Sequence, residues 1–300
     1  MKRVAVTGAN GFIGRHVMQA LAARGDQPVG IPRPYEPARL AGQFAGLDAV
    51  VHLAGVVSAV REREFYAANV DATRTIAEAA RVAGTRLVHI SSLAAAGPAA
   101  PAAPRTESDA PAPINAYGQS KLEGERAIAA VAGLRWTILR PGVVYGPGDR
   151  ALRPLFRYAQ MGIVPLVGNA AAAYTFIYIA DAVRAIVAAV DRGNDGDVIF
   201  LGHEDAVDSR TLMQTIRVAA GSRAPIFSIP RAVVRIAAEA GEWAETLTGR
   251  PATINRRRFA ELYSPGFVCR VDRMKERLGV VAEIGLREGL RIAAGWYLQT

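Results

Sequence analysis

Short apolar runs alternate with longer stretches of helical apolar spacing along the first half of the chain. The apolar runs predict strands at residues 4–6, 28–31, 49–53, 87–90 and 136–139. The helical spacing predicts helices at residues 12–23, 36–45, 62–84 and 115–132. Strands that alternate with helices in this way predict an α/β fold built on a parallel sheet.

The first strand and helix are joined by the glycine-rich turn Thr7-Gly8-Ala9-Asn10-Gly11. Gly8 permits the turn, Gly11 lets the backbone approach a diphosphate, and Gly14 lets the helix pack on the strand. The free N–H groups and the dipole of the helix start favour the charge of that diphosphate. Glycines alone are a weak signal, but strand, turn and helix in this order predict a dinucleotide-binding, doubly wound Rossmann fold.

The alternation fades after residue 149. We therefore expect residues 1–149 with 177–200 to form the dinucleotide-binding domain. Residues 150–176 and 201–300 mix helices and short strands, and we expect them to form a smaller, mixed substrate-binding lobe.

The second predicted strand ends at Pro32-Arg33-Pro34. An NAD site usually carries an acidic residue here, whereas a basic residue suits the 2′-phosphate of NADP. Arg33, helped by Arg39, therefore favours NADP, and the alternative is a solvated surface arginine. Only the helix at 36–45 fits before the next strand, so we expect the sheet to lack an edge strand.

Ser92, Tyr117 and Lys121 are the candidate catalytic residues. Ser92 follows the strand at 87–90, and Tyr117 and Lys121 open the next helix on one face. All three should lie at the carboxyl edge of the sheet, where α/β enzymes bind ligands. The alternative is a surface Tyr and Lys on an amphipathic helix. His52 lies inside a strand and is expected to be structural.

These residue types suit hydride transfer. A secondary alcohol loses a proton as hydride leaves its carbon, and free Tyr, with a pKa near 10, is too weak a base. The Lys121 ammonium and a positive nicotinamide ring should lower the pKa of Tyr117. Ser92 would hydrogen-bond and orient the substrate oxygen.

Composition narrows the class of protein. The 300 residues are 51% hydrophobic, enough for a large domain with a small lobe. The single Cys269 rules out an internal disulfide and fits a reducing compartment, so we expect a cytoplasmic protein. The first apolar run is too short for a secretory signal, no run approaches a membrane span, and no metal site is predicted.

The net charge of +9, from 36 basic and 27 acidic residues, is compatible with nucleic-acid binding. The basic residues are scattered apart from Arg256-Arg257-Arg258, and aromatic residues do not interleave with them. We favour a soluble protein that handles anionic cofactors and binds no nucleic acid. The three arginines could hold an anionic substrate, but a solvated face is the favoured interpretation.

Five stretches together resemble the extended short-chain dehydrogenase/reductases, the NAD(P)-dependent epimerase/dehydratase group, over nearly the whole chain. They are Thr-Gly-Ala-Asn-Gly-Phe-Ile-Gly (7–14), His-Leu-Ala-Gly (52–55), Ser-Ser (91–92), Tyr-Gly-Gln-Ser-Lys (117–121) and Arg-Pro-Gly-Val-Val-Tyr-Gly-Pro-Gly-Asp (140–149).

The resemblance implies roles by position. Ser92, Tyr117 and Lys121 match the family's triad, and Asn69 matches a helix Asn near the active site. It also implies a homodimer that pairs the Asn69 helix with the Tyr117 helix. The matching cofactor contacts are Gly8, Gly11, Phe12, Ile13, Leu53, Ala54, Gly55 and Pro141, and we also expect Asn10, Arg33, Asn69, Tyr117, Lys121 and Val143 to contact the cofactor.

Three departures bear on the substrate. The usual Gly-Asp strand after the second helix is absent, so the adenine pocket should be trimmed. Leu93-Ala94 follows Ser92 in place of the Asp-Glu of sugar dehydratases. Tyr174 replaces an Arg that often holds a sugar-nucleotide diphosphate. With the alanines at 170–173, this favours a less polar substrate, and 225–290 loosely resembles members acting on hydroxysteroids.

We therefore predict an NAD(P)-dependent oxidoreductase that moves hydride between nicotinamide and a secondary alcohol or ketone of low polarity. A nucleotide-sugar 4-epimerase is the first alternative, because it uses the same triad. The second is a non-catalytic, cofactor-binding subunit of a larger assembly.

Overall fold

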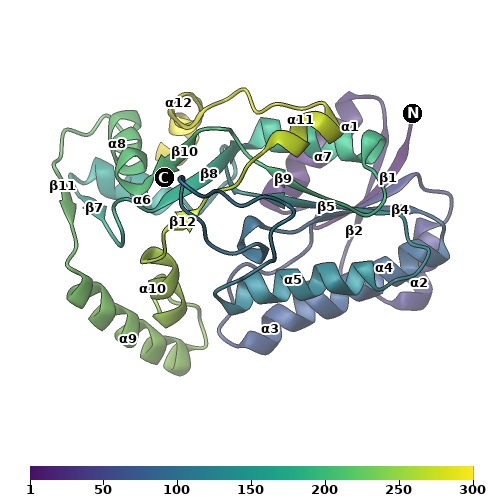
Figure 1. Cartoon of the computed structure of the whole chain (residues 1–300), viewed down its shortest axis with the longest axis horizontal. Helices are drawn as coiled ribbons and strands as arrows, with labels where there is room; N and C mark the ends of the chain where they lie inside the picture. Colours follow the sequence, from purple (N-terminus) through teal and green to yellow (C-terminus); the bar gives the residue numbers. More distant parts are fainter. Residues whose placement is uncertain (300) are drawn as a thin grey trace.

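The computed structural model describes residues 1–299 of the chain. Its centre is a six-stranded parallel sheet in the order β2-β1-β3-β4-β5-β9 (Figure 1). The strands are β1 (Arg3–Thr7), β2 (Gln27–Ile31), β3 (Ala49–His52), β4 (Arg86–Ile90), β5 (Trp136–Pro141) and β9 (Asp197–Leu201). The expected α/β class with a parallel sheet is confirmed.

Helices cover both faces of this sheet (Figure 1). On one face α1 (Phe12–Ala23) packs beside α7 (Ile179–Arg192). On the other lie α2 (Pro37–Phe44), α4 (Ala72–Val82) and α5 (Ala116–Ala129). Alternate residues of β1 serve the two faces, since Val4 and Val6 belong to one core and Ala5 to the other. This two-sided burial explains the continuous apolar runs in the sequence.

Strand β2 forms one edge of the sheet. The sequence predicted this, because the segment after β2 is too short to hold a further strand. Within residues 1–299, α2 is the only regular element between β2 and β3. The long helix predicted at 62–84 is divided into α3 (Glu62–Tyr66), a π-helical turn (Ala67–Asp71) and α4. Such a turn adds a residue to the helix and often marks a functional position.

The second lobe is built on a small mixed sheet, which joins the main sheet through the β5–β6 connection. Its strands are β6 (Val143–Tyr145), β8 (Ala173–Tyr178), β10 (Ala206–Asp208) and β12 (Gly266–Phe267), beside the pair β7 (Val164–Leu166) and β11 (Ile226–Ser228). Its helices are α6 (Arg153–Gln160), α8 (Ser209–Ala219), α9 (Arg231–Thr248), α10 (Arg256–Leu262) and α12 (Leu286–Leu298). Helix α11 (Asp272–Leu278) packs instead against α7 and β9.

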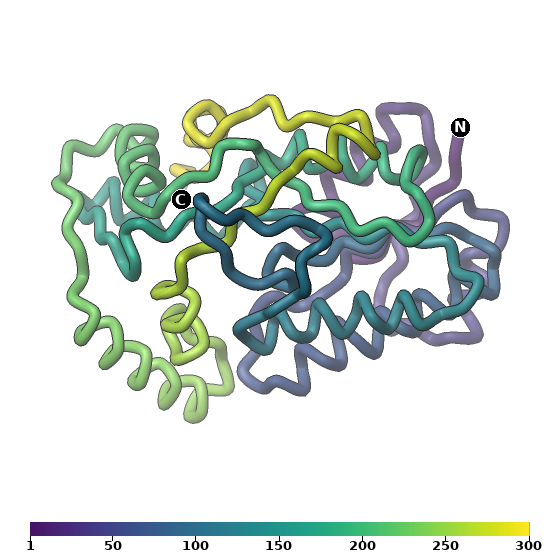
Figure 2. The backbone as a smooth tube through the Cα atoms, viewed as in Figure 1, coloured from purple at the N-terminus to yellow at the C-terminus, as the bar shows by residue number. Residues whose placement is uncertain are grey.

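Two segments of the chain connect the halves. The loop after β4 begins with a 3₁₀ turn (Leu93–Ala95) and bridges to the lobe at Ala99–Phe267 and Arg105–Cys269. The α9–α10 hairpin extends from the lobe towards α3 and α5, as the backbone trace in Figure 2 shows. Among residues 1–299, no helix is both long enough and apolar enough to cross a bilayer.

Candidate functional site

The glycine-rich turn lies at the carboxyl end of β1 and leads directly into α1. Gly8 has φ +68°, and a Cβ there would lie 2.8 Å from the Ala54 nitrogen. A Cβ on Gly14 would come within 2.1 Å of the Gly8 carbonyl oxygen, so helix and turn touch backbone to backbone. Neither position accepts a side chain without a shift of the main chain.

Gly11 has a different role. A Cβ there would meet within 4 Å only the Gly8 carbonyl oxygen, at 3.1 Å. Gly11 is the N-cap of α1, and no side chain among residues 1–299 caps that end. The amides of Phe12 and Ile13 therefore begin the helix without an i–4 carbonyl partner, which suits an anion. A cradle of this shape fits a dinucleotide diphosphate.

Three predicted site residues from separate elements meet beside the end of β3. A Cβ on Gly55 would lie 2.9 Å from Asn69 Oδ1 and 3.9 Å from Lys121 Nζ. Leu53 and Ala54 lead into this point, and the Ala54 amide donates to Thr7 Oγ1 over 3.3 Å. The residues that follow β3 thus pack closely against Asn69 and Lys121.

Asn69 lies in the π-helical turn and is buried. It accepts from the Val56 amide and donates to the Val56 carbonyl, both over 2.9 Å. It also donates to Ser120 Oγ over 2.9 Å, and Ser120 donates to the Tyr117 carbonyl over 2.8 Å. Asn69 therefore locks the loop after β3 to the first turn of α5.

Lys121 is buried on α5, below Tyr117. Its ammonium donates to the Ile90 carbonyl over 2.8 Å and lies 3.5 Å from His89 Nε2. Burial lowers the pKa of Lys121 to about 8, although the charge of Glu125 opposes this effect. Lys121 thus titrates much nearer to neutrality than an ordinary lysine.

Tyr117 behaves differently from the sequence-based expectation. Its pKa is raised: burial is the largest cause, a hydrogen bond with Ser92 works in the opposite direction, and the charge of Glu261 adds to the rise. Lys121 is not among the groups that shift the pKa of Tyr117. The expected lowering counted on a positive nicotinamide ring as well as on Lys121, and the protein's own groups by themselves favour the neutral phenol.

Ser92 sits at the turn after β4, where its Oγ also accepts from the Ala94 amide over 3.2 Å. Helix α5 is started by Asn115, whose side chain accepts from the Gly118 amide over 2.7 Å. A hydrogen bond joins Asn115 to Glu261 of α10. The turn after β4 therefore positions Ser92, and α5 positions Tyr117 and Lys121. Helix α10 of the lobe contacts the start of α5.

Sequence reasoning missed a buried ion pair next to the triad. Arg140 of β5 donates to Glu125 of α5 through Nε over 2.9 Å and Nη2 over 2.5 Å. The Ser91 hydroxyl also donates to Glu125. Two features of the sequence could have indicated this pair. Glu125 lies four residues after Lys121 on the same helical face, and Arg140 directly precedes Pro141, a predicted cofactor contact.

His52 is structural, as expected. It is buried, with Nδ1 2.7 Å from Thr7 Oγ1 and Nε2 3.0 Å from Thr73 Oγ1. Burial and the nearby charges of Lys121 and Arg33 lower the pKa of His52 to about 3, so the ring is neutral. It fastens β1 and β3 to α4 rather than moving protons.

A model of the NAD dependent epimerase/dehydratase family matches residues 4–202, which include the glycine turn, Ser92, Tyr117 and Lys121. The chain belongs to this family. It is therefore related to the NAD-dependent reductases and epimerases of the short-chain dehydrogenase/reductase superfamily.

Two curated relatives and one solved structure illustrate the range of this family. The chain is 29% identical to "Ceramide reductase" of Caulobacter vibrioides, over 98% of this chain and 94% of the relative. It is 28% identical to "4-hydroxy-2-methyl-3-oxo-4-farnesyl-3,4-dihydroquinoline-1-oxide ketoreductase" of Stigmatella aurantiaca, over 80% of each. MoeE5 in complex with UDP-glucose and NAD is 26% identical, with a TM-score of 0.78 and 98% coverage of both chains.

The remaining predicted contacts of this family member lie around the same sheet edge. Arg33 follows β2, is exposed and lies 5.9 Å from the Tyr35 ring. Arg39 is exposed on α2, and neither arginine forms an ion pair within residues 1–299. Pro141 ends β5 and Val143 opens β6, while Asn10 is exposed on the glycine turn.

The expected solvated face holds for Arg256 and Arg258, which are exposed, whereas Arg257 is half-buried. Each arginine also pairs with a glutamate of the same hairpin: Arg256 with Glu239, Arg257 with Glu245, and Arg258 with Glu261. Sequence alone did not show these partners because two of them lie more than ten residues away on α9. Only Arg257 pairs with a buried carboxylate.

Aromatic rings of β8 and β12 pack together in the lobe. Tyr174 stacks on Phe267 with ring centroids 6.4 Å apart, and it meets Phe176 edge-on. The charge of Glu261 raises the pKa of Tyr174 as it does that of Tyr117, although burial is the larger cause. Tyr174 and the triad thus share one neighbour on α10.

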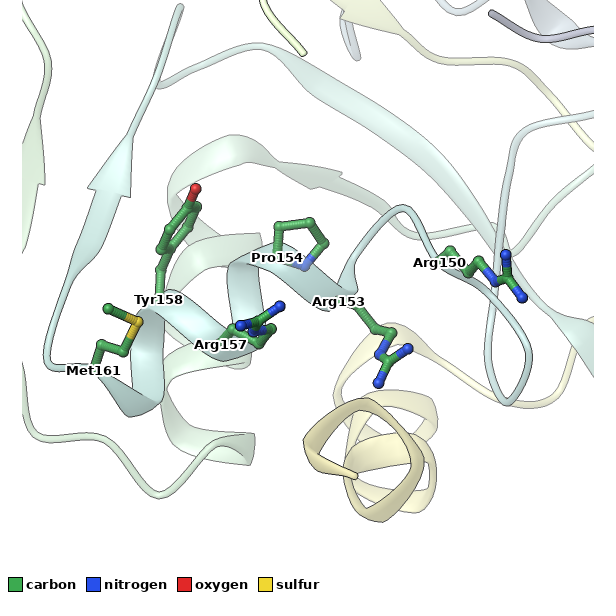
Figure 3. Close-up of a pocket in the computed structure, with 6 residues that line it drawn as sticks. All are labelled: Arg150, Arg153, Pro154, Arg157, Tyr158 and Met161. Carbon is green, nitrogen blue, oxygen red and sulfur yellow. The ribbon is translucent and has the colours of Figure 1, made fainter. Parts of the chain in front are cut away.

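A separate groove of about 500 Å³ lies on α6 (Figure 3). It contains none of the residues predicted for the site. Its lining residues are Arg150, Arg153, Pro154, Arg157, Tyr158 and Met161.

Proposed function

We propose that this protein is an NAD(P)-dependent reductase that converts a ketone of low polarity, carried on a long apolar chain, into a secondary alcohol. The observation that carries the proposal is the Tyr117 phenol: burial, the larger cause, and the charge of Glu261 raise its pKa above the ordinary value, which favours the protonated form. A neutral phenol is a proton donor, and reduction of a ketone needs one.

The cofactor would rest on the cradle of Gly8, Gly11 and Gly14, where added Cβ atoms find no room or would block an anion. When bound, the nicotinamide supplies the hydride that the carbonyl carbon accepts. Tyr117 donates its proton to the carbonyl oxygen, and the Ser92 hydroxyl holds that oxygen. Lys121, whose ammonium donates to the Ile90 carbonyl, would bind the cofactor ribose and support the phenolate formed after transfer.

The substrate class rests on three supports. Two relatives across most of the chain are named as reductases of a ceramide and of a farnesyl-bearing oxo compound. Tyr174 and Phe267 present stacked rings where some sugar-nucleotide enzymes carry an arginine. The arginines of α10 each have a glutamate partner, which competes with a diphosphate for them.

NADP is the proposed cofactor form, because Arg33 and Arg39 are exposed cations beside β2. The Arg33→Ala variant should lose affinity for NADPH while its affinity for NADH changes little. Fluorescence titration of both reduced cofactors against wild type and variant measures this ratio. Equal losses for the two cofactors would remove the basis for the NADP preference.

The direct test uses purified protein, NADPH and a series of methyl ketones of increasing chain length. We expect kcat/KM to rise with chain length. The Tyr117→Phe variant should lose roughly 10²–10⁴-fold in kcat while it still binds NADPH, because only the proton donor is removed. Retention of turnover in this variant would refute the proposal.

A nucleotide-sugar 4-epimerase is the second candidate, favoured by the similarity to MoeE5 with UDP-glucose. An epimerase oxidises and re-reduces one bound sugar, so it retains NAD tightly and shows no net NADPH consumption. UDP-glucose epimerisation with co-purified NAD, and no ketone-dependent oxidation of NADPH, would establish this candidate instead.

A further inference from the structure

Helix α9 has two chemically different faces. The inner face carries Val234, Ala238 and Glu245, all buried. A Cβ on Gly241, also on this face, would lie 1.9 Å from the Ile254 carbonyl oxygen, so the helix packs closely on the following loop. Glu245 accepts from the Ala252 amide and Asn255 Nδ2, each over 2.8 Å. These contacts hold α9 rigidly against the loop and α10.

The outer face is a continuous apolar stripe. Val233, Ile236, Trp243 and Leu247 are 53%, 69%, 74% and 78% exposed. At about 100° per residue, these four side chains fall within about 80° of each other around the helix axis. Ala240 is exposed between them. We name this set the α9 stripe, and nothing in residues 1–299 buries it.

We propose that the α9 stripe docks the protein on the surface of a lipid bilayer that contains anionic lipids. A helix with large apolar side chains on one face and charges on the other lies in the bilayer interface, with Trp near the headgroups. Residues 231–258 carry six arginines and three glutamates, and the whole chain has a net charge of +9. This charge attracts an anionic membrane surface.

Arg235 and Arg250 are exposed in this region and form no ion pair with other described residues. They are therefore available to lipid phosphates without the loss of an ion pair. Their position on and just after α9 places cations next to the apolar stripe, as interfacial binding requires.

A second copy of the chain fits the stripe less well. The stripe extends over 15 residues of helix, about 21 Å from its first residue to its last. Its four large side chains are few beside the roughly 20–30 residues that each partner contributes to a standard protein interface. A bilayer needs no complementary partner surface, so a narrow stripe at the edge of the molecule suffices.

The stripe is also close to the candidate active site. Helix α10 lies between α9 and α5, and its Glu261 bonds to Asn115, two residues before Tyr117 (Figures 1 and 2). A bilayer that contacts α9 would bring membrane lipids close to α10 and to the start of α5, where Tyr117 lies. The docking inference itself does not rest on the proposed reaction, because it concerns binding and not turnover.

Vesicle co-sedimentation of the full chain tests the inference. Wild type should pellet with vesicles of phosphatidylcholine and phosphatidylglycerol, less with phosphatidylcholine alone, and less again at high salt. The Trp243→Gln/Leu247→Gln double variant should partition about tenfold more weakly or worse. The matched control is Val218→Gln on α8, which changes an equally exposed apolar residue (71%) and should bind as wild type.

Tryptophan fluorescence gives a second measurement. Trp243 is the most exposed of the three tryptophans, so its burial among lipids should shift the emission to the blue. The Trp243→Phe variant should keep binding and lose this shift. Two results would overturn the inference: wild type that stays in the supernatant with both vesicle types, or a concentration-dependent dimer that the double variant abolishes.

Discussion

Tyr117 and Lys121 are four residues apart on α5, and the protein shifts their pKa values in opposite directions. Burial raises the pKa of the phenol and lowers that of the ammonium to about 8. In both cases burial disfavours the charged form. Such an arrangement favours a neutral proton donor beside a lysine that still carries its charge at neutral pH, which suits ketone reduction.

The lowered pKa of Lys121 predicts a pH dependence. The value of kcat/KM for the reduced cofactor reports groups of the free enzyme. We expect kcat/KM to be independent of pH near neutrality and to fall as the pH rises through about 8, because Lys121 then loses the charge that would bind the cofactor. A stopped-flow or steady-state pH profile measures this break. A profile that stays level up to pH of about 10, the ordinary range of Tyr, would contradict the role of Lys121.

The Glu125–Arg140 pair permits a second residue-level prediction. Glu125→Ala leaves the buried Arg140 guanidinium without its carboxylate, so the free energy of unfolding should fall by about 3–5 kcal/mol. Glu123→Ala, on the same helix, breaks the pair with exposed Arg126 and a hydrogen bond from Gln119, and should cost less than about 1 kcal/mol. Urea denaturation compares the two, and similar losses would show that the buried pair has no special role.

At the scale of elements, the turn between β1 and α1 depends on direct backbone contact. Gly14→Ala puts a methyl group 2.1 Å from the Gly8 carbonyl oxygen, so α1 must move. We expect a loss of about 1–3 kcal/mol in stability and weaker cofactor binding.

The matched control is Gly42→Ala in α2, where an added Cβ has nothing within 4 Å. A helix-interior Gly-to-Ala change should there stabilise the protein by about 0.5–1 kcal/mol. Urea denaturation and NADPH titration measure both variants. Unchanged stability and cofactor affinity in Gly14→Ala would show that the close packing seen at Gly8 is not needed.

At the scale of the whole molecule, Arg257 joins the lobe to the half that contains the six-stranded sheet. It donates to the Ala59 and Val60 carbonyls over 3.2 Å and to buried Glu245 over 2.9 Å. Since these carbonyls lie in the loop between β3 and α3, one guanidinium ties the α9–α10 hairpin to that loop.

Arg257→Ala should therefore weaken the contact between the α9–α10 hairpin and the loop at residues 55–60. We expect faster amide exchange in residues 55–60 and in α10, and a higher KM for the ketone, with a smaller effect on kcat. The control Arg256→Ala removes an exposed pair with Glu239 and should leave exchange at 55–60 unchanged. Hydrogen-exchange mass spectrometry distinguishes them, and equal exchange in both variants would assign the closure to other contacts.

The sequence by itself determined the parallel sheet, the glycine turn, the missing edge strand and the structural role of His52. These features follow from local rules: apolar runs, the conformational freedom of glycine and the length of a connection. The positions of Ser92, Tyr117 and Lys121 at one sheet edge also followed from strand order, and their roles as a triad stay a prediction.

Only the tertiary structure decided the charge states and the partners of the arginines. The pKa of Tyr117 depends on burial and on Glu261, 144 residues away in the sequence, and Arg140 meets Glu125 only across a folded interface. The α9 stripe also depends on the fold, because the packing of the inner face of α9 decides which of its apolar side chains stay exposed. The physical reason is common to all three: desolvation and ion pairing depend on which segments meet in space, and the sequence pattern carries only local spacing.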